Sequence, residues 1–238
     1  MTTKLSVNIN KVALIRNSRG SNVPDIIKFA QDCEEFGADG ITVHPRPDQR
    51  HIRYYDLKPL KEVVQTEFNI EGYPSEEFLT QVISVCPHQC TLVPDPPGVL
   101  TSDSGWQIDK NVSFLTDVIK RLKDHGIRVS LFIDPEVKQV DFAKSVGADR
   151  IELYTGQYAN HYAIDPKKAV LEHSKCSALA LKIGIGVNAG HDLNLNNLAF
   201  YSRELVSLHE VSIGHAIVTD ALYYGIKNTI GMYKGLLD

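Results

Sequence analysis

The chain has 238 residues, of which 43% are hydrophobic and 23% charged, and its formal net charge is −4 at pH 7. This composition is typical of a soluble globular protein, and the length favours one α/β barrel domain over residues 1–238 rather than two domains. The small negative charge and the absence of a basic run exclude a nucleic-acid-binding protein, so the expected partners are small molecules.

The N-terminal sequence MTTKLSVNINK has neither an apolar signal core nor a cleavage site, and no apolar run is long enough to span a bilayer. We therefore expect a cytoplasmic protein that does not interact with membranes. In that compartment the four cysteines should stay reduced. Cys86, His88 and Cys90 are close in sequence, but no second ligand pair matches them, so no metal site is predicted.

Short apolar runs alternate with amphipathic stretches along the whole chain. The predicted strands cover residues 5–9, 40–44, 68–71, 90–93, 128–133, 150–154, 181–187 and 210–213. The predicted helices include residues 26–36, 57–66, 75–85, 112–125, 136–146 and 166–174.

Local signals mark several boundaries. Pro24 and Asp25 can open the first long helix, because proline fits the first helical turn and aspartate meets the positive end of the helix dipole. Residues 36–39, FGAD, recur in type as residues 146–149, VGAD, and the glycine of each fits a left-handed helix cap. The echo is consistent with a repeated β/α unit.

Eight β/α units in 238 residues predict a (β/α)₈ TIM barrel, whose parallel strands are continuous apolar runs because both faces are covered. The alternative is a doubly wound open sheet. Such a sheet usually has a glycine fingerprint near its first strand, and Arg19-Gly20-Ser21 is not that fingerprint.

The catalytic groups of a barrel collect at the carboxyl ends of its strands. Residues 40–52, GITVHPRPDQRHI, illustrate this, because an apolar strand passes directly into prolines and cationic side chains. Polar residues or glycine lie at or just after the ends of the predicted strands, at Asn8, Asn10, Lys11, His44, Arg46, Glu71, Asp134, Glu152, Thr155, Asn188, His191, Gly214 and His215.

Three of these residues are candidate proton-transfer groups. Glu71 follows Phe68 and Ile70, and burial at this position would raise its pKa toward neutrality. His44 and His191 follow different strands and could act on opposite ends of one substrate. A structural ion pair for Glu71 and a structural role for either histidine stay open as alternatives.

Two regions are candidate anion sites. The glycine-bearing residues 186–191 and 213–216 fit a phosphate site made of backbone N–H groups and a helix N-terminus, or ordinary tight turns. A second positive region comprises Arg19, Arg46, Arg50 and His51. Residues 94–106, PDPPGVLTSDSGW, fit either a lid from which Thr101 reaches a ligand or a passive surface loop.

Taken together, these blocks resemble one known family, the pyridoxine 5′-phosphate synthases. The resemblance covers nearly the whole chain, through VNIN, RNSRG, GADGITVHPRPDQRHI, NIE, LVP, RVSLFID, YTGQYA, VNAGH and IGHA. It implies a (β/α)₈ barrel with extra helices, assembled as a homo-octamer. The implied reaction joins 1-deoxy-D-xylulose 5-phosphate to 3-amino-2-oxopropyl phosphate, closing the pyridine ring of vitamin B6 and releasing phosphate and water.

The resemblance also assigns roles by position. His44 and Glu71 match the family's proton acceptors, and His191 matches its proton donor. The matches to the amino-ketone phosphate site are Asn8, Arg19, Gly214 and His215, and those to the deoxyxylulose phosphate site are Arg46, His51 and Thr101. Positioned acids and bases with two phosphate anchors suffice for this chemistry, so neither a metal nor an organic cofactor is expected.

Two positions depart from the family pattern. Asn10-Lys11 stands where Asp-His is common; Asn10 can still hydrogen-bond a hydroxyl, and Lys11 is expected to pair with a substrate phosphate or carboxylate. Asp192 stands where glycine is usual after His191. Its backbone N–H could still donate to phosphate, while its carboxylate must point away or be paired.

Two other functions are compatible with a phosphate-binding barrel. A phosphosugar isomerase or aldolase would need one phosphate site and would turn over a single phosphorylated substrate. A non-catalytic phosphometabolite-binding protein would leave Glu71, His44 and His191 without a role.

Overall fold

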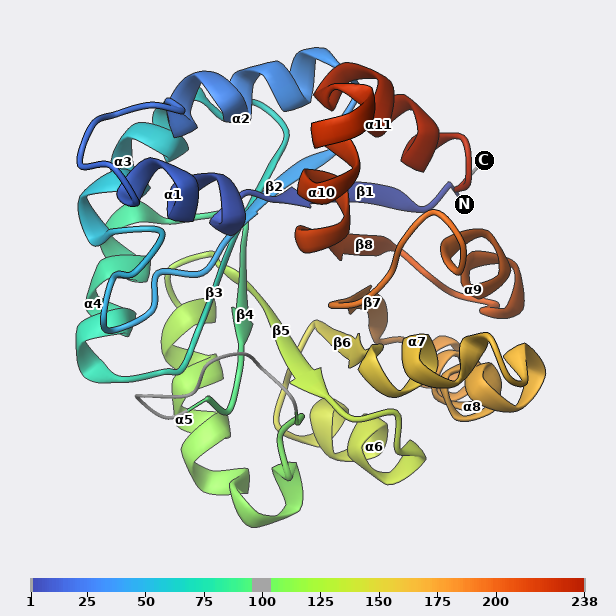
Figure 1. The fold of residues 1–238 in the computed structure, drawn as a ribbon. Coiled ribbons are helices and arrows are strands. Elements are labelled where there is room, and N and C mark those ends of the chain that lie inside the picture. Colours follow the sequence, from blue (N-terminus) through green and yellow to red (C-terminus); the bar gives the residue numbers. More distant parts are fainter. Residues whose placement is uncertain (1, 96–103, 238) are drawn as a thin grey trace.

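A computed structural model of the chain describes residues 2–95 and 104–237. Its strands form a closed parallel barrel in sequential order, with helices around the outside (Figure 1). The strands are β1 (Lys4–Asn8), β2 (Gly40–Val43), β3 (Glu67–Gly72), β4 (Gln89–Leu92), β5 (Arg128–Ile133), β6 (Arg150–Tyr154), β7 (Gly186–Gly190) and β8 (Glu210–Ile213). The predicted (β/α)₈ barrel is confirmed, and the open-sheet alternative is wrong.

The helices comprise the outer ring and several shorter insertions. They are α1 (Asn10–Asn17), α2 (Ile26–Glu35), α3 (Tyr54–Val63), α4 (Glu76–Val85), the 3₁₀ helix η1 (Ile108–Lys110), α5 (Val112–Lys123), α6 (Val137–Ser145), α7 (Gly156–Tyr162), α8 (Pro166–Ile183), α9 (Leu198–Glu204), α10 (His215–Tyr224) and α11 (Ile226–Lys234). Asp25 caps α2 by accepting hydrogen bonds from the N–H groups of Ile27 and Lys28. Pro24 therefore precedes the cap and lies outside the first helical turn.

Two parts of the sequence-based assignment are wrong. The predicted strand at residues 181–187 begins too early, because α8 continues to Ile183 and ends at Gly184, whose φ is +68°. The apolar residues that suggested a strand belong to this helix, and β7 begins only at Gly186. Helix α1 was not among the predicted helices, and it places Asn10 and Lys11 in a helix directly after β1.

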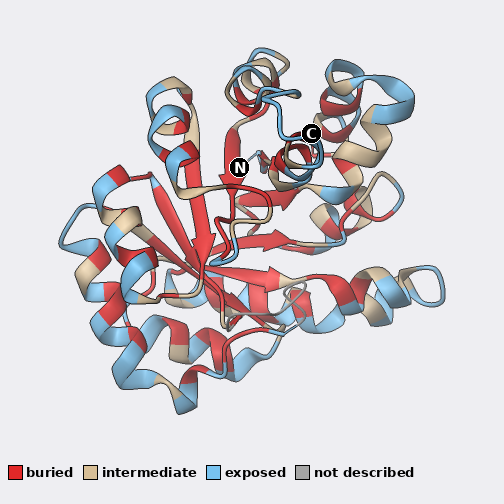
Figure 2. Ribbon diagram, turned by 60° about the vertical axis from the view of Figure 1, so that its left-hand side comes forward, coloured by how far each residue is buried: buried red, intermediate tan, exposed pale blue. Residues whose placement is uncertain are grey.

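The interior of the barrel is polar, whereas its outer face is apolar. Successive strand residues point to opposite faces, so Phe68 and Ile70 of β3 pack under the helices while Asn69 and Glu71 face inward. Asn69 donates to Thr42 at 3.3 Å and accepts from Thr91 at 3.1 Å, which links β2, β3 and β4 across the interior. Figure 2 shows the strands almost entirely buried and the outer faces of the helices exposed.

A repeated hydrogen bond joins the strands in pairs at the amino end of the barrel. The donor is the backbone N–H of the second residue of an odd-numbered strand. The acceptor is the side chain of the residue just before the next, even-numbered strand. The four donor–acceptor pairs are Leu5–Asp39 (2.8 Å), Phe68–His88 (2.9 Å), Val129–Asp149 (2.9 Å) and Val187–His209 (3.2 Å). We call these bonds the strand clamps.

The strand clamps give a physical reason for the repeated tetrapeptide. Asp39 and Asp149 are the final residues of FGAD and VGAD, and each carboxylate also binds a lysine, Lys234 or Lys123 respectively. The glycines of the two tetrapeptides have φ values of +106° and +86°, as expected for left-handed caps. The echo therefore marks equivalent helix-to-strand turns.

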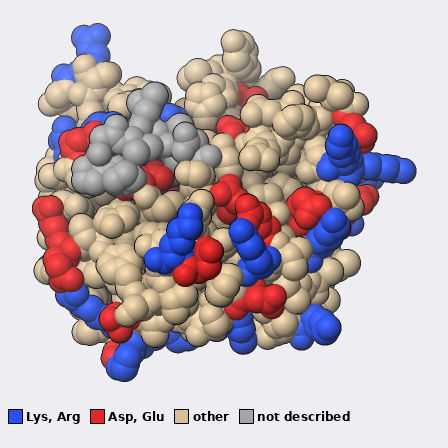
Figure 3. All heavy atoms as spheres, turned by 90° about the horizontal axis from the view of Figure 1, so that it is seen from below, with Lys and Arg blue, Asp and Glu red and all other residues tan. Residues whose placement is uncertain are grey.

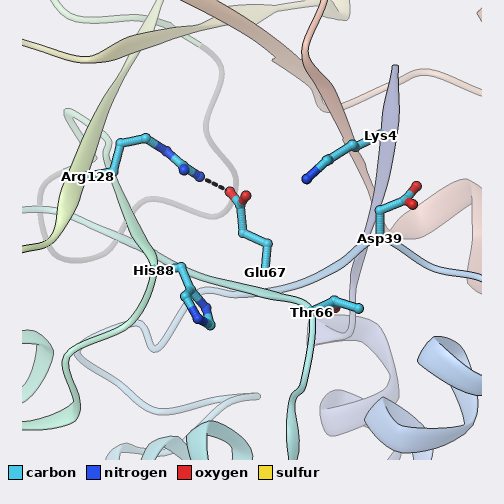
Figure 4. Close-up of a pocket in the computed structure, with 6 residues that line it drawn as sticks. All are labelled: Lys4, Asp39, Thr66, Glu67, His88 and Arg128. Carbon is cyan, nitrogen blue, oxygen red and sulfur yellow. Dashed lines mark hydrogen bonds and ion pairs between the residues drawn. The ribbon is translucent and has the colours of Figure 1, made fainter. Parts of the chain in front are cut away.

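A cavity of about 360 Å³ lies at the amino end of the barrel. Figure 4 shows its lining residues, among which Arg128 donates a hydrogen bond to Glu67. The lining is Lys4, Asp39, Thr66, Glu67, His88 and Arg128, and all six lie at or just before the starts of strands. This cavity is therefore at the opposite end from the candidate catalytic residues.

The surface carries both charge signs. On the face seen in Figure 3, lysine and arginine side chains are intermingled with aspartate and glutamate side chains. Among the described residues, no helix combines the length and apolar character that a membrane crossing requires.

Replacing Asp149 by alanine should destabilise the fold, because the Val129 N–H would lose its acceptor. An unpaired buried amide costs about 1–3 kcal/mol, which for a chain of this size lowers the melting temperature by roughly 2–12 °C. Asp149→Asn keeps an acceptor oxygen and should lose less, a difference that thermal denaturation would measure. Equal melting temperatures for both variants would contradict a stabilising role for the clamp.

Candidate active site at the carboxyl ends of the strands

The turn from β1 into α1 supports the end of β2. The Asn8 side chain accepts the N–H of Asn10 at 3.1 Å, and the Asn10 side chain in turn accepts the N–H of His44 at 2.9 Å. The backbone of His44 is thereby fixed from the neighbouring strand. Asn10 thus has a structural contact that nothing in the local sequence indicates.

His44 and Glu71 lie next to each other at the ends of β2 and β3. Nδ1 of His44 is 3.9 Å from Oε2 of Glu71, and both side chains are buried. Burial, reinforced by Glu210, raises the pKa of Glu71 to about 8, although Arg46 opposes the shift. Burial and the positive charge of Arg46 lower the pKa of His44 well below its usual value. Both shifts favour a protonated carboxyl group and a neutral imidazole at neutral pH.

Glu152 is a second buried carboxyl group beside Glu71. Burial and the proximity of Glu71 raise its pKa, and its Oε2 has no hydrogen-bond partner among the described residues. Oε1 lies against Gly190 of β7, where an added Cβ would come within 2.4 Å of it. Glycine at position 190 thus leaves room for the Glu152 carboxyl group. This group lies between Glu71 and the segment that carries His191.

The loop after β2 gathers positive charge around His44. Arg46 donates to Asp95 at 3.0 Å, and both side chains are buried. The rings of His51 and His44 are 6.4 Å apart in an edge-on arrangement. Burial, Arg46 and Arg50 lower the pKa of His51 to about 4, so its ring is neutral at physiological pH.

His191 follows β7 in a constrained conformation. Its φ of +104° lies in the left-handed region, which is unusual for a residue with a Cβ. The ring packs edge-on against Tyr154 at 5.3 Å, and Nδ1 is 2.9 Å from the carboxylate of Asp192. Asp192 is thus paired with its neighbour, and the bond to His191 lowers its pKa.

The end of β8 approaches the end of β1. A Cβ on Gly214 would lie 2.9 Å from the backbone oxygen of Asn8, so only glycine allows this contact without a shift. His215 is the first residue of α10, whose N-terminus therefore begins beside Asn8. Asn8, Gly214 and His215, predicted to share one phosphate site, are brought together in space.

Three predicted site residues have a different status. Lys11 is exposed on α1, but its charge contributes to the low pKa of His51, so it lies near that ring. Arg19 is exposed in the turn after α1, and no described residue pairs with it. Thr101, like most of the predicted lid, lies outside the described residues.

The residues of the possible metal motif point to separate surroundings. Cys90 is buried in β4, Cys86 is exposed, and the His88 ring accepts the N–H of Phe68 in a strand clamp. Within residues 2–95 and 104–237, no cluster of three or more histidine, cysteine or acidic side chains could hold a metal ion.

Comparison with known proteins links this geometry to a family. A family model described as "Pyridoxal phosphate biosynthesis protein PdxJ" matches residues 5–238. Pyridoxine 5′-phosphate synthase of Parabacteroides distasonis is 53% identical over 236 residues, which cover 99% of each chain. The protein of the same name from Bacteroides fragilis is 54% identical over 235 residues, again 99% of each chain.

Solved structures share the fold at low identity. Tryptophan synthase from M. tuberculosis, in the aminoacrylate-bound form, aligns with a TM-score of 0.66 and 10% identity, covering 100% of this chain and 94% of that one. Thiamine phosphate pyrophosphorylase from Pyrococcus furiosus aligns with a TM-score of 0.64 and 10% identity, covering 99% and 95%. These likenesses concern the barrel alone.

The raised pKa of Glu71 can be tested by infrared spectroscopy. At pH 6.5 the Glu71 side chain should contribute a protonated carboxyl band, which should fade as pH rises through about 8. Subtracting the spectrum of a Glu71→Gln variant isolates this band from those of Glu152 and Glu210. A difference spectrum without a protonated carboxyl band at pH 6.5 would show that Glu71 is ionised.

Proposed function

The chain belongs to the PdxJ family of pyridoxal phosphate biosynthesis proteins, and we propose that it catalyses the reaction of a pyridoxine 5′-phosphate synthase. The observation that supports this most directly is the position of His44 next to Glu71 at neighbouring strand ends, with Nδ1 3.9 Å from Oε2. The pair offers a base and an acid at neutral pH without any change in net charge.

The substrates in this proposal are 1-deoxy-D-xylulose 5-phosphate and 3-amino-2-oxopropyl phosphate. The amine condenses with a carbonyl group to form an imine, and an aldol-type step then closes the pyridine ring. One inorganic phosphate and two water molecules leave, which balances the atoms of pyridoxine 5′-phosphate. Imine formation, the aldol-type step and the eliminations each require proton transfers, which general acids and bases promote. The reaction belongs to the transferase class as a ring-closing condensation.

The acid and base roles follow from the protonation states. His44 acts as a proton acceptor, because its lowered pKa leaves the ring neutral and Asn10 fixes its backbone. Glu71, with a pKa of about 8, can donate a proton at one step and accept one at another. His191 donates a proton from the opposite side, oriented by Asp192 and Tyr154.

Two phosphate sites flank these groups. Asn8, Gly214 and His215 hold the amino-ketone phosphate, where the N-terminus of α10 supplies backbone N–H donors. Arg46 and His51 hold the deoxyxylulose phosphate, with Lys11 near His51. We also assign Arg19 to the first site and Thr101 to the second on the family resemblance, while Asn10 hydrogen-bonds a hydroxyl and the Asp192 N–H donates to phosphate.

We further propose a cytoplasmic homo-oligomer, an octamer by family resemblance. Helices α1 and α10 pack against each other, and both carry exposed apolar side chains. These exposed side chains support the proposed assembly. They are Leu14, Ile15, Leu222, Tyr223 and Tyr224, and Tyr223 is 86% exposed in the isolated chain. Such a surface is suited to a second copy of the chain.

The proposed function predicts that both substrates are needed. Purified protein mixed with both should yield a pyridine chromophore and free phosphate, and neither should form with one substrate alone. Each of the variants His44→Asn, Glu71→Gln and His191→Asn should lower kcat by about 10²–10⁴-fold, the usual contribution of a general acid or base.

His125→Asn is the matched control, because His125 is exposed on the outer surface and should not affect the rate. Turnover of a single phosphorylated substrate would instead identify an isomerase or aldolase. Binding of both compounds without any product would identify a non-catalytic protein.

Lys11 should contribute affinity for deoxyxylulose phosphate rather than proton transfer. Replacing it by glutamine removes one positive charge near His51, so KM for this substrate should rise about threefold to tenfold with kcat nearly unchanged. Lys182→Gln, on the exposed face of α8, serves as a control for the loss of charge. An unchanged KM for deoxyxylulose phosphate in Lys11→Gln would refute this role.

A further inference from the structure

Arg16 is a charged residue buried far from solvent. It lies in the last turn of α1, and its side chain is 4% exposed. Its guanidinium group donates to both carboxylate oxygens of Asp56 in the first turn of α3, from Nη1 at 2.8 Å and from Nη2 at 2.9 Å. This two-point contact fixes the distance and the relative orientation of the two helices.

The same ion pair also binds the chain that enters α3. Nη2 of Arg16 donates to the backbone oxygen of His51 at 3.1 Å. Oδ2 of Asp56 accepts the N–H of Arg53 at 2.8 Å. The loop is therefore bound on both sides of residue 52.

Asn17 adds two more bonds to this loop. Its amide nitrogen donates to the backbone oxygens of Arg50 at 3.0 Å and His51 at 2.8 Å. Its own side-chain oxygen accepts the Nε–H of Arg16 at 3.0 Å, which orients the amide group. The His51 carbonyl thus has two donors from α1.

His51 depends on this placement. Its Nδ1 accepts the N–H of Ile52 at 2.9 Å, so in the neutral ring the proton is on Nε2, the nitrogen left for a ligand. A neutral N–H donor contributes to anion binding through position and direction rather than through net charge. A shift of the loop would therefore remove most of the contribution of His51 to anion binding.

We propose that Arg16, Asn17 and Asp56 form a positioning network that holds His51 for the phosphate of 1-deoxy-D-xylulose 5-phosphate. None of the three touches the substrate in this proposal. A buried ion pair adds little net stability over an apolar pair of the same size. The Arg16–Asp56 pair is therefore better explained by its effect on the position of the loop than by its effect on stability. The inference rests on the proposed function, because it concerns one of the two substrates.

The network also couples the two halves of the site. Helix α1 begins at Asn10, whose side chain holds the His44 backbone, and ends with the residues that hold the His51 backbone. One short helix therefore sets both histidines relative to each other. A displacement of its C-terminal end should affect the His51 end more than the His44 end.

Asn17→Asp is the most direct test, because the replacement keeps the size of the side chain and the acceptor for Arg16 but removes both donated bonds. We expect KM for deoxyxylulose phosphate to rise about tenfold to a hundredfold, the usual effect of a small misplacement in a site. KM for 3-amino-2-oxopropyl phosphate should rise much less, because Arg19, the residue of its proposed site that follows Asn17, makes no bond to the network. Asp56→Asn should show the same split between the two substrates.

The outcomes separate the network from the proposed function. Wild-type protein that forms no product from the two substrates would end the proposed function. Active wild type with an Asn17→Asp variant whose two KM values are both unchanged, or rise together, would end the network proposal alone. Arg121→Gln, which removes an exposed ion pair with Glu76 on the outer helices, should leave both KM values unchanged. If Asp56→Asn does not fold, Asn17→Asp decides alone.

Discussion

The removal of carboxyl groups from water is the constraint on which this barrel depends. Inward-facing positions keep Glu71, Glu152 and Glu210 away from solvent, and burial raises the pKa of each. A buried charge must be paired or neutralised. Oε2 of Glu210 is 3.6 Å from Nη1 of Arg150, a permanent cation. The basic group next to Glu71 is instead the ring of His44, whose Nδ1 is 3.9 Å from Oε2. The raised pKa of Glu71 therefore places an exchangeable proton beside His44 at the carboxyl end, whereas Glu210 at the amino end lies beside Arg150.

Hydrogen bonds between side chains and the backbone have different roles at the two ends of the barrel. At the amino end, side chains close hydrogen bonds between neighbouring strands, which favours stability. At the carboxyl end, the side chains of Asn10 and Asn17 bind the backbone of the loop after β2. These bonds fix the positions of His44 and His51, which that loop carries. The separation fits the general pattern of such barrels, in which one face carries stability and the other carries chemistry.

The sequence was sufficient for the fold, because the apolar residues of each strand and the helical patterns between the strands mark eight β/α units; the site residues chosen at the strand ends stay predictions. It was insufficient where tertiary contacts override local pattern. Residues 181–183 resemble a strand but extend α8, and α1 has no capping side chain to announce it. Glu152 lies between apolar neighbours, and its approach to Glu71 depends on barrel closure. Arg16 and Asp56 are 40 residues apart, and nothing local indicates that they meet.

The acceptors of the strand clamps follow the order aspartate, histidine, aspartate, histidine around the barrel, so the pattern repeats after four strands. Each bond stays within one pair of consecutive strands, and none crosses from β4 to β5 or from β8 to β1. The clamp acceptors thus follow the same order in the two halves of the polypeptide. The amino end of the barrel therefore has a twofold pattern of clamps, which the residues proposed for catalysis at the other end do not follow.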